Sequence, residues 1–300
     1  MSNKLILLLK GFCMGAADVV PGVSGGTVAF ILGIYQQLLT AIKSFDIIWL
    51  RHILKFEIKA ALHYPHFNFL IPLVIGIGCA LLFFTRVIPL PTLLHSDPEL
   101  IYGLFFGLIV GSIVTLLPEI GKLDLRAISY ILFGTLLGYL IVTLVPMDTP
   151  DGAWFIFISG ALAISAMLLP GISGSFILLI LRKYDVVFNA IGHLQFAILI
   201  PFGLGIIVGL VLFSRFLSWL LNAYHRATVS TIIGVLIGTL WLIWPFQFRE
   251  YTLVHEKSKL IASTPYFPDS FTLPVMYALL MMIFGMIIVF VINILMKKTR

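Results

Sequence analysis

Long apolar segments are the feature that most constrains how this chain can fold. Ten of them follow one another along the sequence, at residues 4–20, 23–42, 67–90, 100–118, 128–146, 153–169, 171–181, 194–214, 228–246 and 271–296. Most are long enough for an α-helix to cross a hydrocarbon core of about 30 Å, and a helix satisfies its own backbone hydrogen bonds, as a segment in lipid must. They therefore predict an all-α, polytopic membrane protein. The mean hydropathy of +1.11 agrees with this.

Internal repetition divides the chain into two halves. Residues 21–35 read PGVSGGTVAFILGIY and residues 170–184 read PGISGSFILLILRKY, with Pro-Gly, Ser-Gly, Ile-Leu and the final Tyr in common and no gap between them. A second set of matching residues follows each run. Here the residues of the first half are Pro72, Gly76, Phe84 and Arg86, and their counterparts, all separated from them by the same number of residues, are Pro201, Gly205, Phe213 and Arg215. We therefore expect two repeats, residues 1–150 and 151–300, within one integral membrane domain.

Each repeat is expected to hold a broken helical hairpin and then three further helices. The hairpins would cover residues 11–42 and 153–184, and the segment 171–181 is too short to span the bilayer, so a hairpin could cross or re-enter. Either way each half crosses an odd number of times, which inverts the second half relative to the first. Inverted repeats with interrupted helices are typical of transporters. If each hairpin were one broken span, the halves would instead be parallel.

The charges favour an orientation with both termini in the cytoplasm. This orientation places most of the 19 Lys and Arg residues inside, as the positive-inside rule requires, although Arg182 and Lys183 fall outside. These bases do not form a stripe interleaved with aromatic residues, so a nucleic-acid partner is not expected. The 43–66 connection could be an amphipathic helix on the cytoplasmic leaflet or a solvated loop. The 247–270 connection is expected to be a loop.

The Pro-Gly-x-Ser-Gly turns are the candidate anion site. Ser24 and Ser173 stand where the next helix would begin, so hydroxyls and free N–H groups would converge there with the positive end of the helix dipole. Two such turns facing one another would enclose an anion near the midplane, whereas the plain alternative is a helix kink. The residues expected to bind are Ser24, Gly25, Gly26, Thr27, Ser173, Gly174 and Ser175, and those expected to form the turns are Pro21, Gly22, Pro170 and Gly171.

Three charged residues in or beside apolar segments complete the candidate site. Arg86 and Arg215 are repeat equivalents, and a guanidinium can contact phosphate with two parallel hydrogen bonds, although either side chain could instead snorkel to the interface. Asp18 could take up a proton or a sodium ion during transport, or could cap the hairpin through backbone N–H groups. No cofactor or metal is expected.

An enzymatic function is the main alternative to transport. The runs 22–25 and 171–174 match the Gly-x-Ser-Gly signature of intramembrane serine proteases, and catalysis would need a base within reach of the serine. The seven histidines lie in connections or near segment ends. We therefore do not expect the chain to be an enzyme.

Two long motifs carry a resemblance to a known family. The runs GFCMGAADVVPGVSGGTVAFILGIY, residues 11–35, and AMLLPGISGSFILLILRKY, residues 166–184, resemble the PopT-type polyprenyl-phosphate translocases, and the resemblance extends over essentially the whole chain. It implies that the substrate is undecaprenyl phosphate, carried from the outer to the inner leaflet of the bacterial cytoplasmic membrane. Because Asp18 is a candidate proton or sodium site, a gradient of either ion is expected to drive this transport. The other hypotheses are a transporter or channel for a small soluble anion and a membrane-embedded serine hydrolase or lipid phosphatase. The oligomeric state is left open.

Overall fold

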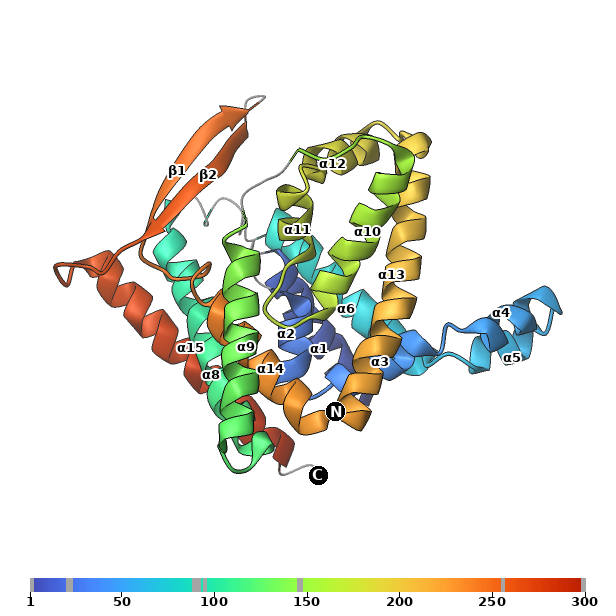
Figure 1. The fold of residues 1–300 in the computed structure, drawn as a ribbon, viewed down its shortest axis with the longest axis horizontal. Coiled ribbons are helices and arrows are strands. Elements are labelled where there is room, and N and C mark those ends of the chain that lie inside the picture. The colour runs from blue at the N-terminus through green and yellow to red at the C-terminus, as the bar shows by residue number, and fades with distance from the viewer. Residues whose placement is uncertain are drawn as a thin grey trace.

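The computed structural model shows a bundle of helices with both termini at one end (Figure 1). It describes residues 3–19, 24–87, 93, 96–144, 148–254 and 257–297. Within these ranges, five helices are long and apolar enough to cross a membrane: α6 (Phe67–Arg86), α8 (Pro98–Ile120), α9 (Leu125–Val142), α13 (Phe196–Ala223) and α15 (Leu273–Lys297). The chain is a multi-pass membrane protein, as the apolar segments predict.

Two broken hairpins lie among these long helices. The first consists of α1 (Asn3–Asp18), α2 (Gly25–Ile31) and α3 (Tyr35–Lys43), and the second of α10 (Ala153–Leu168), α11 (Gly174–Ile180) and α12 (Tyr184–Gly192). The axes of α2 and α3 differ by 120°, so this pair is a broken span or a re-entrant loop.

The break after the short helix has the same backbone conformation in both hairpins. Gly33 and Arg182 hold equivalent positions of the repeat, and both have positive φ, at 65° and 51°. This region costs glycine little but is unfavourable for a residue with a Cβ. The second hairpin therefore makes the same turn with a less suitable residue.

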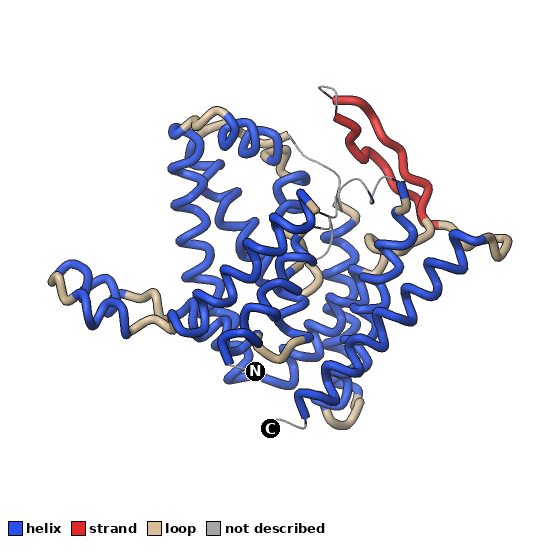
Figure 2. The backbone as a smooth tube through the Cα atoms, turned by 180° about the vertical axis from the view of Figure 1, so that it is seen from behind, coloured by secondary structure: helices blue, strands red, loops and turns tan. Residues whose placement is uncertain are grey.

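The remaining elements are short. Helices α4 (Ile47–Leu54) and α5 (Ile58–His63) form the 43–66 connection, and α14 (His225–Thr239) lies in the bundle. The prediction of a loop over 247–270 is wrong, because β1 (Gln247–Val254) and β2 (Lys257–Pro265) pair there as an antiparallel hairpin (Figure 2). Both runs contain β-branched residues, and β1 also contains aromatic residues; these are the types that suit strands.

The packing of α1 on α6 is repeated in the packing of α10 on α13. A Cβ on Gly76 would overlap the carbonyl oxygen of Leu8, and a Cβ on Gly205 would overlap that of Phe157. Gly76 and Gly205 are repeat equivalents, and the separation between Leu8 and Phe157 equals that between the two Pro-Gly turns. The same close backbone approach therefore occurs at matching places in both halves, as small residues at membrane helix contacts allow.

The last two helices of each half pack across the repeat boundary. In the first half Gly107 of α8 lies against Met282 of α15, and in the second half Gly238 of α14 lies against Thr135 of α9. Each half thus packs its final helix on the other half. Figure 1 also shows α12 at the end opposite the termini and α3 nearer to them, which agrees with an inverted repeat. The inversion itself stays a prediction, which superposition of the halves would test.

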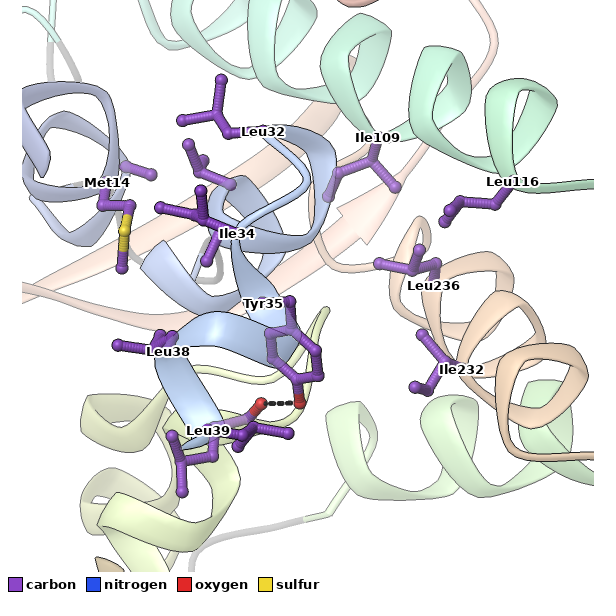
Figure 3. Close-up of a cluster of buried hydrophobic side chains, with 14 of the residues drawn as sticks. Met14, Leu32, Ile34, Tyr35, Leu38, Leu39, Ile109, Leu116, Ile232 and Leu236 are labelled. Atoms are coloured by element: carbon purple, nitrogen blue, oxygen red, sulfur yellow. Dashed lines mark hydrogen bonds between the residues drawn. The ribbon is translucent and has the colours of Figure 1, made fainter. Parts of the chain in front are cut away.

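The main hydrophobic core surrounds the break of the first hairpin. Ile34, Leu39 and Ile109 are buried there together with Ile233 and Ala29 (Figure 3). The core draws on α2, α3, α8 and α14, so both halves contribute to it. A broken helix is therefore placed at the centre of the molecule and not at its edge.

We expect Gly76→Ala and Gly205→Ala to destabilise the protein by about 1–3 kcal/mol, because the added methyl would force apart backbones that now touch. Gly78→Ala and Gly203→Ala are the matched controls on the same two helices, since a Cβ there meets nothing within 4 Å. Thermal unfolding of the purified protein in detergent gives the comparison. Equal losses at all four positions would show that the close approaches do not hold the helices together.

Candidate functional site

The start of α2 carries the hydrogen bonds that the first turn was expected to make. Ser24 is the N-cap residue, and the Gly26 N–H donates to its Oγ at 3.1 Å. The Gly25 N–H donates to Oδ1 of Asp18 at 2.7 Å, so the capping contact of Asp18 is present. Ser24 and Ser173 both immediately precede a helix, as predicted. Pro21 and Gly22, which were expected to form this turn, lie outside the described residues.

Two hydroxyl groups of the first hairpin cap the C-terminal end of α10. The Ser24 hydroxyl donates to the carbonyl of Met167 at 2.9 Å, and the Tyr35 hydroxyl donates to that of Leu168 at 2.5 Å (Figure 3). These carbonyls have no partner within α10, because the helix ends there and the chain turns at Pro170. Side chains from the first hairpin therefore take the place of the missing helical N–H donors.

A third hydrogen bond runs the other way, from the second hairpin to the first. The N–H of Gly171 donates to Oγ1 of Thr27 at 2.8 Å. Gly171 has φ +92°, and a Cβ there would lie 2.9 Å from Oγ1 of Thr239, so both the backbone and the space call for glycine. The start of α2 thus meets the end of α10 and Gly171, and three of the predicted residues, Ser24, Thr27 and Gly171, form hydrogen bonds at this contact.

The two turns differ in what they offer a ligand. Ser173 caps no backbone N–H, and its Oγ lies 2.8 Å from that of Ser175, with either hydroxyl able to donate. Asp18 places a carboxylate at the first turn, whereas its repeat equivalent is Met167. The first turn therefore already has an anion beside its amides, and the second turn has hydroxyls without one in the described part of the chain.

The arginines lie away from these bonds. Arg86 is exposed in the last turn of α6 and Arg215 is exposed on α13, and no hydrogen bond or ion pair joins either to a described residue of the turns. Slight burial of Asp46 raises its pKa, but hydrogen bonds within the α4–α5 connection and the charge of Arg215 bring the pKa below its ordinary value. A phosphate-binding role for either arginine stays a prediction.

Arg182 and Lys183, between α11 and α12, each form an ion pair with a carboxylate. Arg182 pairs with Asp148, and the buried Lys183 donates from Nζ to Oδ1 of Asp151 at 2.5 Å and to the carbonyl of Thr149 at 3.1 Å. These pairs offset the positive charge of Arg182 and of the buried Lys183.

Tyr35, Lys10 and Thr149 take part in the hairpins although they were not singled out from the sequence. Lys10 donates to the carbonyl of Leu32 at 3.0 Å, and Thr149 donates to the equivalent carbonyl of Leu181 at 2.5 Å. The only signal for Tyr35 was its identity with Tyr184 in the repeat. The sequence gave no signal for Lys10 or Thr149. The two side chains donate to equivalent carbonyls, but they are of different types, so a comparison of the repeats does not reveal them.

The serines show no catalytic arrangement in the ranges that the structure describes. The Ser24 hydroxyl is engaged with a carbonyl, and no described histidine bonds to Ser24 or Ser173. In the same ranges there is no group of three or more His, Cys, Asp or Glu side chains that could hold a metal ion.

We expect Thr27→Val to destabilise the protein by about 1–3 kcal/mol, because it removes the acceptor and leaves the buried N–H of Gly171 unsatisfied. Thr40→Val is the control, since the Thr40 hydroxyl donates only to Gln36 of its own helix, at an exposed site. Thermal unfolding in detergent measures both. If Thr27→Val behaves like the control, the turns are not held together by this bond.

Comparison with known proteins agrees with the two hairpin motifs. The undecaprenyl phosphate translocase-like family matches residues 14–261. A polyprenyl-phosphate transporter of Vibrio cholerae serotype O1 is 41% identical over 247 residues, which cover 82% of this chain and 79% of that protein. A polyprenyl-phosphate transporter of Staphylococcus aureus is 34% identical over 261 residues, covering 81% and 87%. No solved structure matches the chain. The chain belongs to the undecaprenyl phosphate translocase-like family.

Proposed function

We propose that this chain carries undecaprenyl phosphate from the outer to the inner leaflet of the bacterial cytoplasmic membrane and catalyses no chemical reaction. The family and the relatives named as polyprenyl-phosphate transporters support the substrate. The single structural observation that carries the proposal is the contact between the two hairpins, which brings the start of α2 and its hydroxyls against the end of α10 and Gly171 in an apolar bundle.

The chemistry of the substrate fits such a contact. A polyprenyl phosphate has a small charged head on a long apolar tail, so a carrier must remove water from the head while the tail stays in lipid. Burial of the head requires hydrogen-bond donors that replace its water. The proposed donors are the hydroxyls of Ser24, Thr27, Ser173 and Ser175 and the amides of Gly25, Gly26 and Gly174, with Arg86 and Arg215 as the source of formal positive charge.

Several of these donors are engaged in the arrangement described here. The Ser24 hydroxyl bonds to Met167, and the Gly25 N–H bonds to Asp18. A phosphate that enters between the turns would take over these donors, and the two hairpins would separate as it does so. The bonds between the turns then hold the centre closed when no substrate is bound.

Asp18 is the proposed coupling residue. Its carboxylate occupies the N–H of Gly25, one of the groups proposed for the phosphate. A proton or a sodium ion bound to Asp18 would weaken this bond and reduce the repulsion between the carboxylate and the phosphate. Movement of the ion down its gradient could in this way drive movement of the lipid.

The orientation follows from the charges. With both termini in the cytoplasm, α12 and the β-hairpin face outward, at the end of the molecule opposite the termini (Figure 1). Most Lys and Arg residues then lie inside. The substrate would enter from the outer leaflet near the break between α11 and α12, where Arg182 and Lys183 lie.

Arg86→Ala and Arg215→Ala should each weaken binding of undecaprenyl phosphate about tenfold or more, with partial rescue by lysine, which lacks the planar fork of arginine. Binding of the phosphate, of its uncharged alcohol and of inorganic phosphate to purified variants is the measurement. Arg126→Ala, at an exposed position on α9, is the control. Variants that still prefer the phosphate to the alcohol as strongly as the parent does would remove the arginines from recognition. Preference for inorganic phosphate would favour a soluble-anion carrier.

Asp18→Asn should leave the fold intact and abolish the dependence of transport on a proton or sodium gradient. The amide oxygen of asparagine can still accept from the Gly25 N–H, but it can neither be protonated nor bind an ion by charge. Transport by reconstituted protein under imposed gradients is the measurement. Asp97→Asn, an exposed carboxylate at the start of α8, is the matched control. Gradient dependence that persists in Asp18→Asn excludes Asp18 from coupling.

A further inference from the structure

The α4–α5 hairpin, residues 47–63, extends sideways from the helical bundle. Figures 1 and 2 both show it beyond the end of α3, apart from the other helices. Neither helix has a buried residue. The apolar side chains are correspondingly open, with exposed fractions of 68% at Ile47, 70% at Leu54, 85% at Phe56, 64% at Ile58 and 62% at Leu62. Such a surface in water would be unfavourable, and nothing in the described chain covers it.

The hairpin keeps a defined shape in spite of this exposure. The Trp49 indole donates from Nε1 to the carbonyl of Ala61 at 3.0 Å, which joins the two helices. The Tyr64 hydroxyl donates to Oδ2 of Asp46 at 2.9 Å and closes the base. Phe56 forms the connection with φ 56°. The apolar side chains are thus presented by a folded element and not by a loose loop.

Basic side chains are interspersed with the apolar ones. Arg51, Lys55 and Lys59 are all exposed, against one carboxylate in the hairpin, Glu57, which is engaged with His52 at 2.5 Å. Short helices that combine open apolar side chains with Lys and Arg bind in the interfacial plane of anionic membranes. The net positive charge therefore complements an anionic lipid surface.

The base of the hairpin has the composition of a membrane interface. The ring of Phe45 lies 4.9 Å from that of Trp49 and 5.9 Å from that of Phe67, the first residue of α6. Trp and Tyr gather where a membrane helix leaves the hydrocarbon core. The hairpin thus leaves the bundle at the level where α6 enters the membrane, which places it beside the lipid headgroups.

We propose that the α4–α5 hairpin lies on the cytoplasmic leaflet, with the side chains of Leu54, Phe56 and Leu62 among the acyl chains and Arg51, Lys55 and Lys59 at the phosphates of anionic lipids. The assignment to the cytoplasmic leaflet rests on the orientation in the proposed function. The hairpin is a lipid-binding surface separate from the transport site, and it extends the contact of the protein with the leaflet that receives the carried lipid.

The experiment measures the depth of the hairpin in full-length protein whose Cys13 and Cys79 are replaced by alanine. A nitroxide is attached at Phe56→Cys, at Leu54→Cys as a second position in case the first variant fails to fold, and at Leu123→Cys as control. Leu123 is also an exposed apolar residue, and it lies in the loop between α8 and α9. The protein is reconstituted into vesicles of phosphatidylglycerol and phosphatidylcholine. Collision rates with oxygen and with a water-soluble nickel complex are then compared.

The proposal predicts a ratio of oxygen to nickel collisions several-fold higher at the hairpin than at Leu123. Replacing Arg51, Lys55 and Lys59 by glutamine should lower this ratio in vesicles rich in phosphatidylglycerol and leave it unchanged in pure phosphatidylcholine. A water-like ratio at the hairpin would overturn the proposal. So would strong spin–spin broadening, which would indicate a second copy of the chain on this surface. Neither result bears on lipid transport, which is measured separately.

Discussion

The backbone at the two interrupted helices imposes the constraint on which the rest of this structure depends. The end of α10 and the turn at Gly171 leave carbonyl and N–H groups without helical partners, and in an apolar bundle an unpaired group costs several kcal/mol. Side chains of the first hairpin satisfy backbone groups of the second, because Ser24 and Tyr35 donate to the end of α10 and Thr27 accepts from Gly171. The second turn takes these partners from the first hairpin, so the two halves are joined at the centre.

The surrounding helices make this central contact possible. Helices α1 and α10 each lie against a long helix through close backbone approaches, and α9 and α15 cross to pack on the opposite half. This exchange ties the halves together away from the turns, whereas the contact between the turns consists of a few hydrogen bonds. In the proposed cycle the bonds between the turns would break and form again while the packed helices stay in place, as a carrier with a central site requires.

The sequence predicts well where the helices are broken and poorly which residues pair across the breaks. Serine is a favoured N-cap residue, and a Pro-Gly pair interrupts the preceding helix, so the positions of Ser24 and Ser173 at helix starts follow from the local sequence. The partner of Tyr35 depends on how two distant segments meet, and no local pattern carries that information. The β-hairpin over 247–265 was not predicted, because its mixture of charged residues is typical of a solvated loop. For residues 47–63 the sequence did not decide between an amphipathic helix and a loop.

The differences between the repeats matter more for transport than their likeness. Two identical inverted halves would give inward-open and outward-open states of equal energy. Asp18 has Met167 as its equivalent, and the buried Lys183, paired with Asp151, has Ile34. Each of these charges forms contacts in its own hairpin that the other half lacks, so in the proposed cycle the two states would differ in energy. In the proposed cycle, an ion bound at Asp18 changes that difference on one side only, and this asymmetry is what allows a gradient to give the lipid a direction.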